Sequence, residues 1–188
     1  MVNWLAVKLK GKQWFTILAP KYFGEKEIGK TISSIPEALI GKTINVSAVE
    51  LTNDINKYYI KLKFKVTSVD DDKAFSQFHG SECLQDYISR MVLHRIRRID
   101  SIQDLETSDK VKLRVKGLTI VSKKMKSSVM GIIRKFVSDI VKKYVEDSTL
   151  EEFLYQMLSN EIKDKVLKEG RRIYPIRNFE IRKVEVIQ

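Results

Sequence analysis

Cysteine, histidine and proline are scarce in this chain, and it has no long apolar run. The single cysteine, Cys83, excludes an intrachain disulfide, and one cysteine with two histidines cannot build a zinc site of the usual cysteine-rich kind. No apolar run approaches the ~18 residues that a membrane-spanning helix needs, and residues 1–8 lack the pattern of a secretory signal. We therefore expect a cytoplasmic protein that is not bound to a membrane and holds no metal and no cofactor.

Segments that would divide the chain into domains are also missing. It has only three prolines, no glycine- or serine-rich linker and no internal repeat, and its 188 residues fit one domain of ordinary size. A hydrophobic fraction of 43% is enough to fill a core. We predict a single domain over residues 1–188, which begins with a short basic segment, residues 1–13.

Acidic residues are fewer than basic residues. Lysine and arginine total 35 and aspartate and glutamate total 24, so the formal net charge is +11. Such an imbalance points to a polyanionic partner, which is nucleic acid or, less often, an anionic membrane surface.

Alternation of apolar and charged side chains predicts several β-strands. In the clearest, residues 58–69, Ile60, Leu62 and Phe64 face one side while three lysines, at 61, 63 and 65, face the other. This strand should have one buried face and one row of positive charge. Further strands are predicted at residues 14–18, 43–49, 111–121 and 179–187.

Apolar residues at helical spacing predict helices between these strands. Leu84, Ile88 and Ile99 belong to a pattern that predicts a helix over residues 84–99 after an N-cap at Ser81. Further helices are predicted over residues 128–144, after a capping box at residues 148–151, and over residues 161–168 with an end at Gly170. The order of elements predicts an α+β fold, an antiparallel β-barrel or strongly curved sheet with packed α-helices.

One enzyme motif is present, in residues 24–31, which match the phosphate-binding pattern G-x-x-x-x-G-K-[ST]. A P-loop joins a buried strand to a long helix. Here no strand precedes the match, Pro36 stops a long helix, and two glutamates would lie beside the phosphates. We expect a surface loop and keep a P-loop nucleotide-binding protein, using Lys30 and Thr31, as the alternative. Neither His79 nor Cys83 has an evident catalytic partner, so we predict no catalytic residue.

Basic residues recur in clusters along the chain, with little acidic compensation nearby. A single cluster is usually a solvated face, but several together favour phosphate contacts in several places. We predict RNA contacts at Lys8, Lys10, Lys12, Lys30, Lys61, Lys63, Arg90, His94, Arg97, Arg98, Lys123, Lys124, Lys126, Lys135, Arg171, Arg172 and Arg177.

A set of short segments follows in order along nearly the whole chain: Trp14-Phe15, Ala19-Pro20, Gly29-Lys30-Thr31, Leu51-Thr52-Asn53-Asp54, Phe78-His79-Gly80 and Ile173-Tyr174-Pro175-Ile176-Arg177. In this order they resemble the archaeal and eukaryotic family of small-subunit ribosomal proteins called S-one-e, or S-three-A-e. The long lysine-rich N-terminal tail common in that family is almost absent here, which favours an archaeal member.

The resemblance implies a structural constituent of the small ribosomal subunit that catalyses no reaction. It implies a β-barrel with packed helices, placed on the platform near the mRNA exit and the 3′ end of the ribosomal RNA. The implied partners are this RNA, neighbouring ribosomal proteins and, as a further candidate, mRNA near the exit. An RNA-binding assembly or translation factor outside the ribosome is the remaining alternative.

Overall fold

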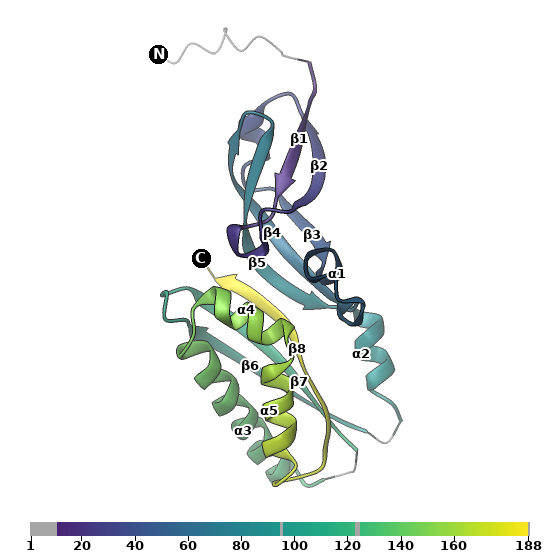
Figure 1. Cartoon of the computed structure of the whole chain (residues 1–188). Helices are drawn as coiled ribbons and strands as arrows, with labels where there is room; N and C mark the ends of the chain where they lie inside the picture. The colour runs from purple at the N-terminus through teal and green to yellow at the C-terminus, as the bar shows by residue number, and fades with distance from the viewer. Residues whose placement is uncertain (1–10, 95, 123–124, 188) are drawn as a thin grey trace.

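The chain folds into two sets of strands joined end to end by one long strand. The structure, a computed structural model, describes residues 11–94, 96–122 and 125–187 (Figure 1). One end of the molecule holds β1 (Gln13–Leu18), β2 (Glu27–Ser33), β3 (Thr43–Ser47), β4 (Ile60–Asp70) and β5 (Lys73–Cys83). The other end holds β6 (Arg97–Glu106), β7 (Lys112–Val121) and β8 (Ile176–Ile187).

Helices cover the second end on one face. They are α3 (Ser127–Glu146), α4 (Leu150–Leu158) and α5 (Glu161–Gly170), whereas the short α1 (Ala48–Thr52) belongs to the first end and α2 (Gln85–Met91) links the two. Three 3₁₀ turns complete the first end: η2 (Lys21–Phe23), η3 (Pro36–Leu39) and η4 (Ile55–Lys57).

All eight strands of the described residues belong to one sheet, in the order β2-β1-β5-β8-β7-β6, with β4 on the other edge of β5 and β3 beyond β4. Pairing is antiparallel except between β1 and β5. The α+β class is confirmed, but the barrel is wrong. The sheet is open because β2, β3 and β6 each pair with a single strand among the described residues, so that no closed ring forms. One edge of β5 pairs with β1 over Lys73–Phe75 and with β8 over Gly80–Glu82, and two groups of strands diverge from it.

Gly80 permits the junction between β5 and β8. A Cβ atom at this position would lie 2.5 Å from the backbone oxygen of Val184 on β8. Because such a contact is far inside van der Waals distance, only glycine lets the two backbones approach here.

The main hydrophobic core runs through both ends, and a smaller cluster of Ile17, Val66 and Ala74 lies apart from it in the first end. Leu62 and Phe64 of β4 pack into the same cluster as Leu113 and Val115 of β7 and Ile133 of α3. Burial of each such side chain stabilises the fold by about 1.5–3 kcal/mol. The helices over β6–β8 therefore bury one sheet face. The other face exposes Lys112 and Arg114 in the first half of β7, whereas residues 117–121 are buried on both faces.

Several predicted elements are confirmed and others are corrected. The strand at β4 alternates as expected, buried at Ile60, Leu62 and Phe64 and exposed at Lys61 and Lys63. The helix predicted over residues 84–99 is wrong after Met91, where α2 ends. Residues 97–106 form β6 instead, which pairs with β7 along ten residues. Strands β2, β5 and β6 were not predicted.

The ends of two later helices also differ from the predictions. The capping box of α4 begins one residue later, since the Thr149 hydroxyl accepts from the backbone N–H of Glu152 and that carboxylate accepts from the N–H of Thr149. Ser148 instead donates to the Tyr144 carbonyl oxygen. Gly170 is the last residue of α5 rather than the first one beyond it, and Arg171 is the C-cap.

Candidate nucleic-acid interface

The sheet face that the helices leave uncovered collects positive charge from several strands. Strand pairing brings Lys63 of β4 opposite Asn45 of β3 and Gly80 of β5, Gly80 opposite Glu185 of β8, and Glu185 opposite Arg114 of β7. Paired residues project to the same side of a sheet. The charged side chains of these strands therefore lie on one continuous surface.

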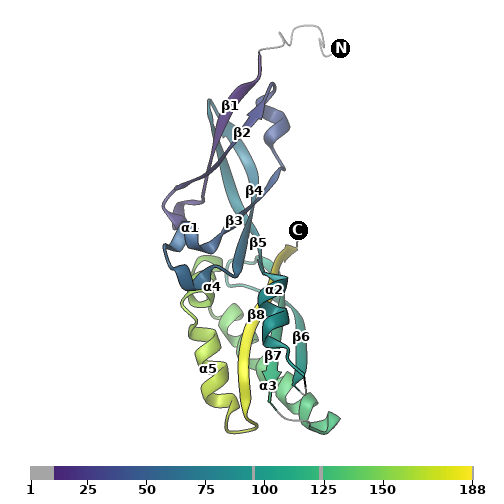
Figure 2. The same cartoon turned by 90° about the vertical axis from the view of Figure 1, so that its right-hand side faces the viewer.

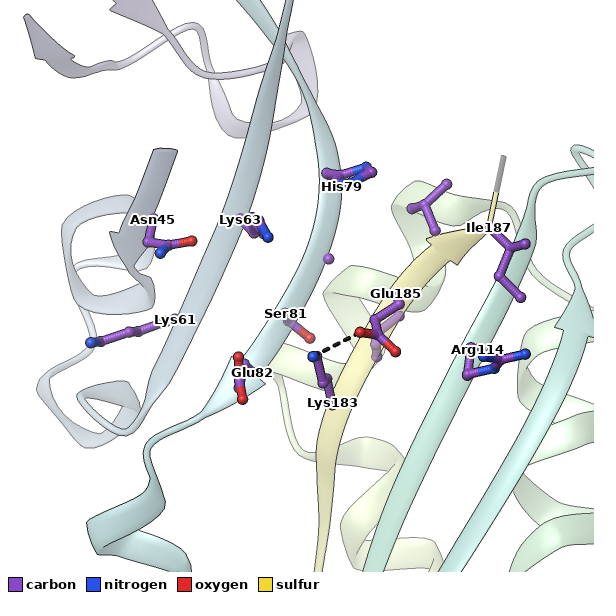
Figure 3. Close-up of a pocket in the computed structure, with 13 residues that line it drawn as sticks. Asn45, Lys61, Lys63, His79, Ser81, Glu82, Arg114, Lys183, Glu185 and Ile187 are labelled. Carbon is purple, nitrogen blue, oxygen red and sulfur yellow. Dashed lines mark ion pairs between the residues drawn. The ribbon is translucent and has the colours of Figure 1, made fainter. Parts of the chain in front are cut away.

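A cleft of about 430 Å³ opens on this surface where β8 leaves β5 (Figure 3). We call it the fork cleft. Its walls include Lys61, Lys63 and His79 on one side and Arg114 and Lys183 on the other. Two carboxylates, from Glu82 and Glu185, also line it.

His79 reaches the fork cleft through a β-bulge. Lys63 pairs with Gly80 and Phe64 pairs with Phe78, so His79 has no partner across the strand pair. Burial, followed by the charges of Lys65 and Lys63, holds the pKa of His79 below its ordinary value of 6.5. The imidazole is therefore neutral at pH 7, and a nearby phosphate would favour its charged form.

Ion pairs neutralise one side of the cleft. Glu185 lies 2.8 Å from the Lys116 ammonium and 2.7 Å from that of Lys183, and their hydrogen bonds lower the pKa of Glu185 to about 2. Arg114 pairs with Asp104 at 2.7 Å.

The β4 side of the cleft keeps its charge. In the part of the chain that the structure describes, no ion pair engages Lys61 or Lys63. Positive charge is therefore available to a polyanion mainly along β4.

A second basic surface lies at the far end of the sheet. Arg97 at the start of β6 pairs with Val121 at the end of β7, which pairs with Ile176 at the start of β8. This register gathers three connections at one end of the molecule: from α2 to β6, from β7 to α3, and from α5 to β8 (Figure 1).

These connections and the strand ends beside them define the basic end. It comprises eight of the predicted contacts: Arg90, His94, Arg97, Arg98, Lys126, Arg171, Arg172 and Arg177. All eight side chains are exposed, and Arg98 is paired with Asp100 at 3.0 Å. Basic residues from three segments that are distant in the sequence, 90–98, 126 and 171–177, therefore belong to one surface.

Lys61 and Lys63 line the fork cleft, and three other predicted contacts lie apart from both surfaces. Lys12 precedes β1, Lys135 lies on the exposed side of α3, and Lys30 on β2 is paired with Glu27 at 3.3 Å. Lys8, Lys10, Lys123 and Lys124 lie outside the described residues. Conversely, Arg114 and Lys183 line the fork cleft although they were not among the predicted contacts; the alternation of basic residues in 112–116 was the available indication.

The P-loop-like match does not have P-loop geometry. Residues 27–33 form the edge strand β2, paired antiparallel with β1, and no helix begins after Thr31. The expected surface loop is thus a strand, and the strand–loop–helix arrangement that cradles phosphates is not formed at residues 24–31.

Among residues 11–94, 96–122 and 125–187, no group of three or more histidine, cysteine, aspartate or glutamate side chains is placed to hold a metal ion. Within the same residues, no helix is long and apolar enough to cross a membrane. The Cys83 thiol is buried, donates to the Ile181 carbonyl oxygen at 3.2 Å, and has its pKa raised by burial to about 12.

Comparison with known proteins gives one consistent result. The model of the Ribosomal S3Ae family matches residues 6–188. The chain is 35% identical to a small ribosomal subunit protein eS1 of Methanopyrus kandleri, over 96% of this chain and 88% of that relative. It is 34% identical to proteins of the same name from Sulfolobus acidocaldarius, over 96% of this chain and 92% of the relative, and from Archaeoglobus fulgidus, over 94% and 84%.

Proposed function

The chain belongs to the ribosomal S3Ae family, and from this membership we propose that it is a non-catalytic protein of the small ribosomal subunit that binds ribosomal RNA through the fork cleft and the basic end. The observation that supports RNA binding most strongly is the convergence of basic residues from three separate segments at the basic end. Clusters brought together by strand register form one electropositive surface, which attracts the phosphates of a folded RNA.

The two surfaces suit different segments of the same RNA. Arg177 and Lys183 lie six residues apart on β8, which corresponds to roughly 20 Å along a strand. Two phosphate-rich segments at this spacing would each meet a group of cations. Arginine at the basic end favours bidentate contacts with phosphate, whereas the lysines of the fork cleft act as point charges.

We place the protein on the platform of the subunit, near the mRNA exit and the 3′ end of the ribosomal RNA. Its partners there are this RNA, neighbouring ribosomal proteins and mRNA that leaves the subunit. This assignment extends family membership, and the net charge of +11 and the two basic surfaces are compatible with it.

Sedimentation tests the ribosomal role. In a gradient of cell extract at moderate salt, the protein should co-migrate with the small subunit. Recovery only at the top of the gradient would instead favour a factor outside the ribosome.

Binding to small-subunit ribosomal RNA tests the interface. The logarithm of the affinity should fall linearly with the logarithm of the salt concentration. Replacing Lys61 and Lys63 with alanine should reduce the magnitude of this slope by about one for each phosphate that these lysines neutralise. A matched variant, with alanine at the exposed Lys42 and Lys73, removes the same charge away from both surfaces. Equal effects of the two variants would contradict a role of the fork cleft.

A further inference from the structure

A groove of about 890 Å³ lies on the helix side of the sheet, between η2 and α4. We call it the α4 groove. Phe23 of η2 stacks edge-to-face on Phe64, with ring centroids 5.9 Å apart, on the face of β4 opposite Lys61 and Lys63. Figure 2 shows α4 beneath α1. The groove is therefore separate from the fork cleft, which opens on the other face of the sheet.

The charge of the α4 groove is opposite to that of the protein. Three carboxylates line it, from Glu151, Glu152 and Glu161, and no lysine or arginine does so in the described part of the chain. Glu152 closes the capping box of α4, and Glu161 accepts from the Ser159 hydroxyl at 3.0 Å. In a protein of net charge +11, this is a local reversal of sign, and it would repel RNA phosphates.

Apolar and aromatic side chains form the rest of the groove. Tyr155 projects from α4 with 71% of its surface exposed, and Tyr22 and Phe23 line the opposite wall. An exposed aromatic beside apolar walls is typical of a site that receives an apolar side chain of a partner. Burial raises the pKa of Tyr22 to about 12, so its hydroxyl adds no charge to the groove at neutral pH.

An unused hydrogen-bond acceptor lies at the same place. The Oε1 atom of Gln156, a lining residue, is buried and has no hydrogen-bond partner among the described residues. A buried amide oxygen without a donor costs about 1–3 kcal/mol. Because this oxygen is closed to solvent, an N–H of a bound segment would satisfy it once the amide side chain turns toward the groove.

We infer that the α4 groove binds an extended protein segment in which lysine or arginine flanks an apolar side chain. The basic residues face the three carboxylates, the apolar residue packs on Tyr155, Tyr22 and Phe23, and an N–H group reaches Gln156. The inference goes beyond RNA binding, because it concerns a different face, a different sign of charge and a protein partner.

Fluorescence anisotropy on the isolated chain tests this directly. The probe is a short synthetic peptide with lysine and arginine on both sides of one phenylalanine. One control peptide has serine in place of phenylalanine, and another has glutamate in place of the basic residues. The probe should bind saturably and less tightly at high salt, and both controls should bind much more weakly. Equal binding of the probe and the serine control would overturn the inference, since the groove would then act only as diffuse charge.

Variants locate the peptide on the protein. Replacing both Glu151 and Glu161 with lysine should weaken probe binding roughly tenfold, whereas Glu37→Lys, on the exposed η3 turn away from the groove, should leave it unchanged. Tyr155→Ser removes an exposed side chain and should also weaken binding roughly tenfold without loss of folding. Unchanged affinity in folded Tyr155→Ser would exclude this groove.

A crosslinker in the intact small subunit identifies the partner class. Benzoylphenylalanine in place of Tyr155 should crosslink to a protein segment rich in lysine and arginine, identified by mass spectrometry. A crosslink to RNA would overturn the inference. This measurement rests on the ribosomal proposal, whereas the peptide assay does not, so a failure of either proposal can be told apart.

Discussion

Glu180 should be the most costly carboxylate to remove from this protein. It lies on β8 with only 6% of its surface exposed, and it accepts hydrogen bonds from the Tyr87 hydroxyl at 3.0 Å and the Tyr59 hydroxyl at 3.4 Å. The Lys163 ammonium of α5 lies 2.5 Å away. Tyr59 and Tyr87 stack on one another with ring centroids 3.9 Å apart. The carboxylate thus joins the start of β4, α2 and α5 at the junction of the two ends.

The expected cost follows from what Glu180→Ala leaves behind. Both hydroxyls lose this acceptor and Lys163 loses its counterion. The ammonium of Lys57, buried and without a hydrogen-bond partner among the described residues, loses a nearby negative charge. Breaking one buried pair costs about 3–5 kcal/mol, a large share of the total stability of a typical domain, about 5–15 kcal/mol. Glu180→Gln keeps an acceptor for the tyrosines and should cost less.

Urea unfolding followed by circular dichroism measures the difference. Glu185→Ala is the matched control, because Glu185 lies on the same strand and also pairs with two lysines, but its side chain is 37% exposed. Its removal should cost less than about 1 kcal/mol. If Glu180→Ala were no more destabilising than Glu185→Ala, burial would not be what makes the Glu180 network important.

Four further predictions concern single residues or the whole chain. Cys83 should react with iodoacetamide at pH 8 roughly a thousandfold more slowly than a free thiol, measured by mass spectrometry, because a pKa of about 12 leaves little thiolate; fast labelling of the folded protein would contradict this. Because lysine hydrogen bonds lower the pKa of Glu185 from 4.5 to about 2, its contribution to stability is present above pH 4.5 and is lost as the pH falls towards 2; acid titrations of wild type and Glu185→Gln should therefore diverge above this window and converge below it. Gly80→Ala should lower the midpoint of urea unfolding by placing a Cβ against β8, at a cost of about 1–3 kcal/mol, whereas Gly29→Ala, where a Cβ meets nothing within 4 Å, should not. We also propose that residues 1–188 form one cooperative domain, since β5 pairs with strands of both ends; calorimetry should show a single transition, and two separate transitions would refute the proposal.

The spacing of apolar residues correctly predicted the strands and helices that are stabilised mainly by their own amphipathic pattern. The alternation along β4 indicated both its buried face and its row of lysines. The apolar spacing of α3 placed that helix within one or two residues of its observed ends. In contrast, residues 97–99 were assigned to a helix because Ile96 and Ile99 continue the spacing of α2. Ten-residue pairing of β6 with β7 outweighs this weak local preference, and no sequence window contains that pairing.

The binding surfaces likewise have some properties that follow from the sequence and others that follow only from the tertiary structure. The sequence by itself determined a net charge of +11, the identity of the basic residues and, through ordered motifs, the family, because each of these depends on composition or on neighbours along the chain. Only the tertiary structure decided which charges act together. The register of β6, β7 and β8 gathers Arg97 and Arg177 at one end, and the fork of β5 opens a cleft beside Lys63. The packing of η2 near α4 leaves an acidic groove in a basic protein. These arrangements depend on pairing and packing between residues far apart in the chain, whose geometry is set by backbone hydrogen bonds and the core rather than by local spacing.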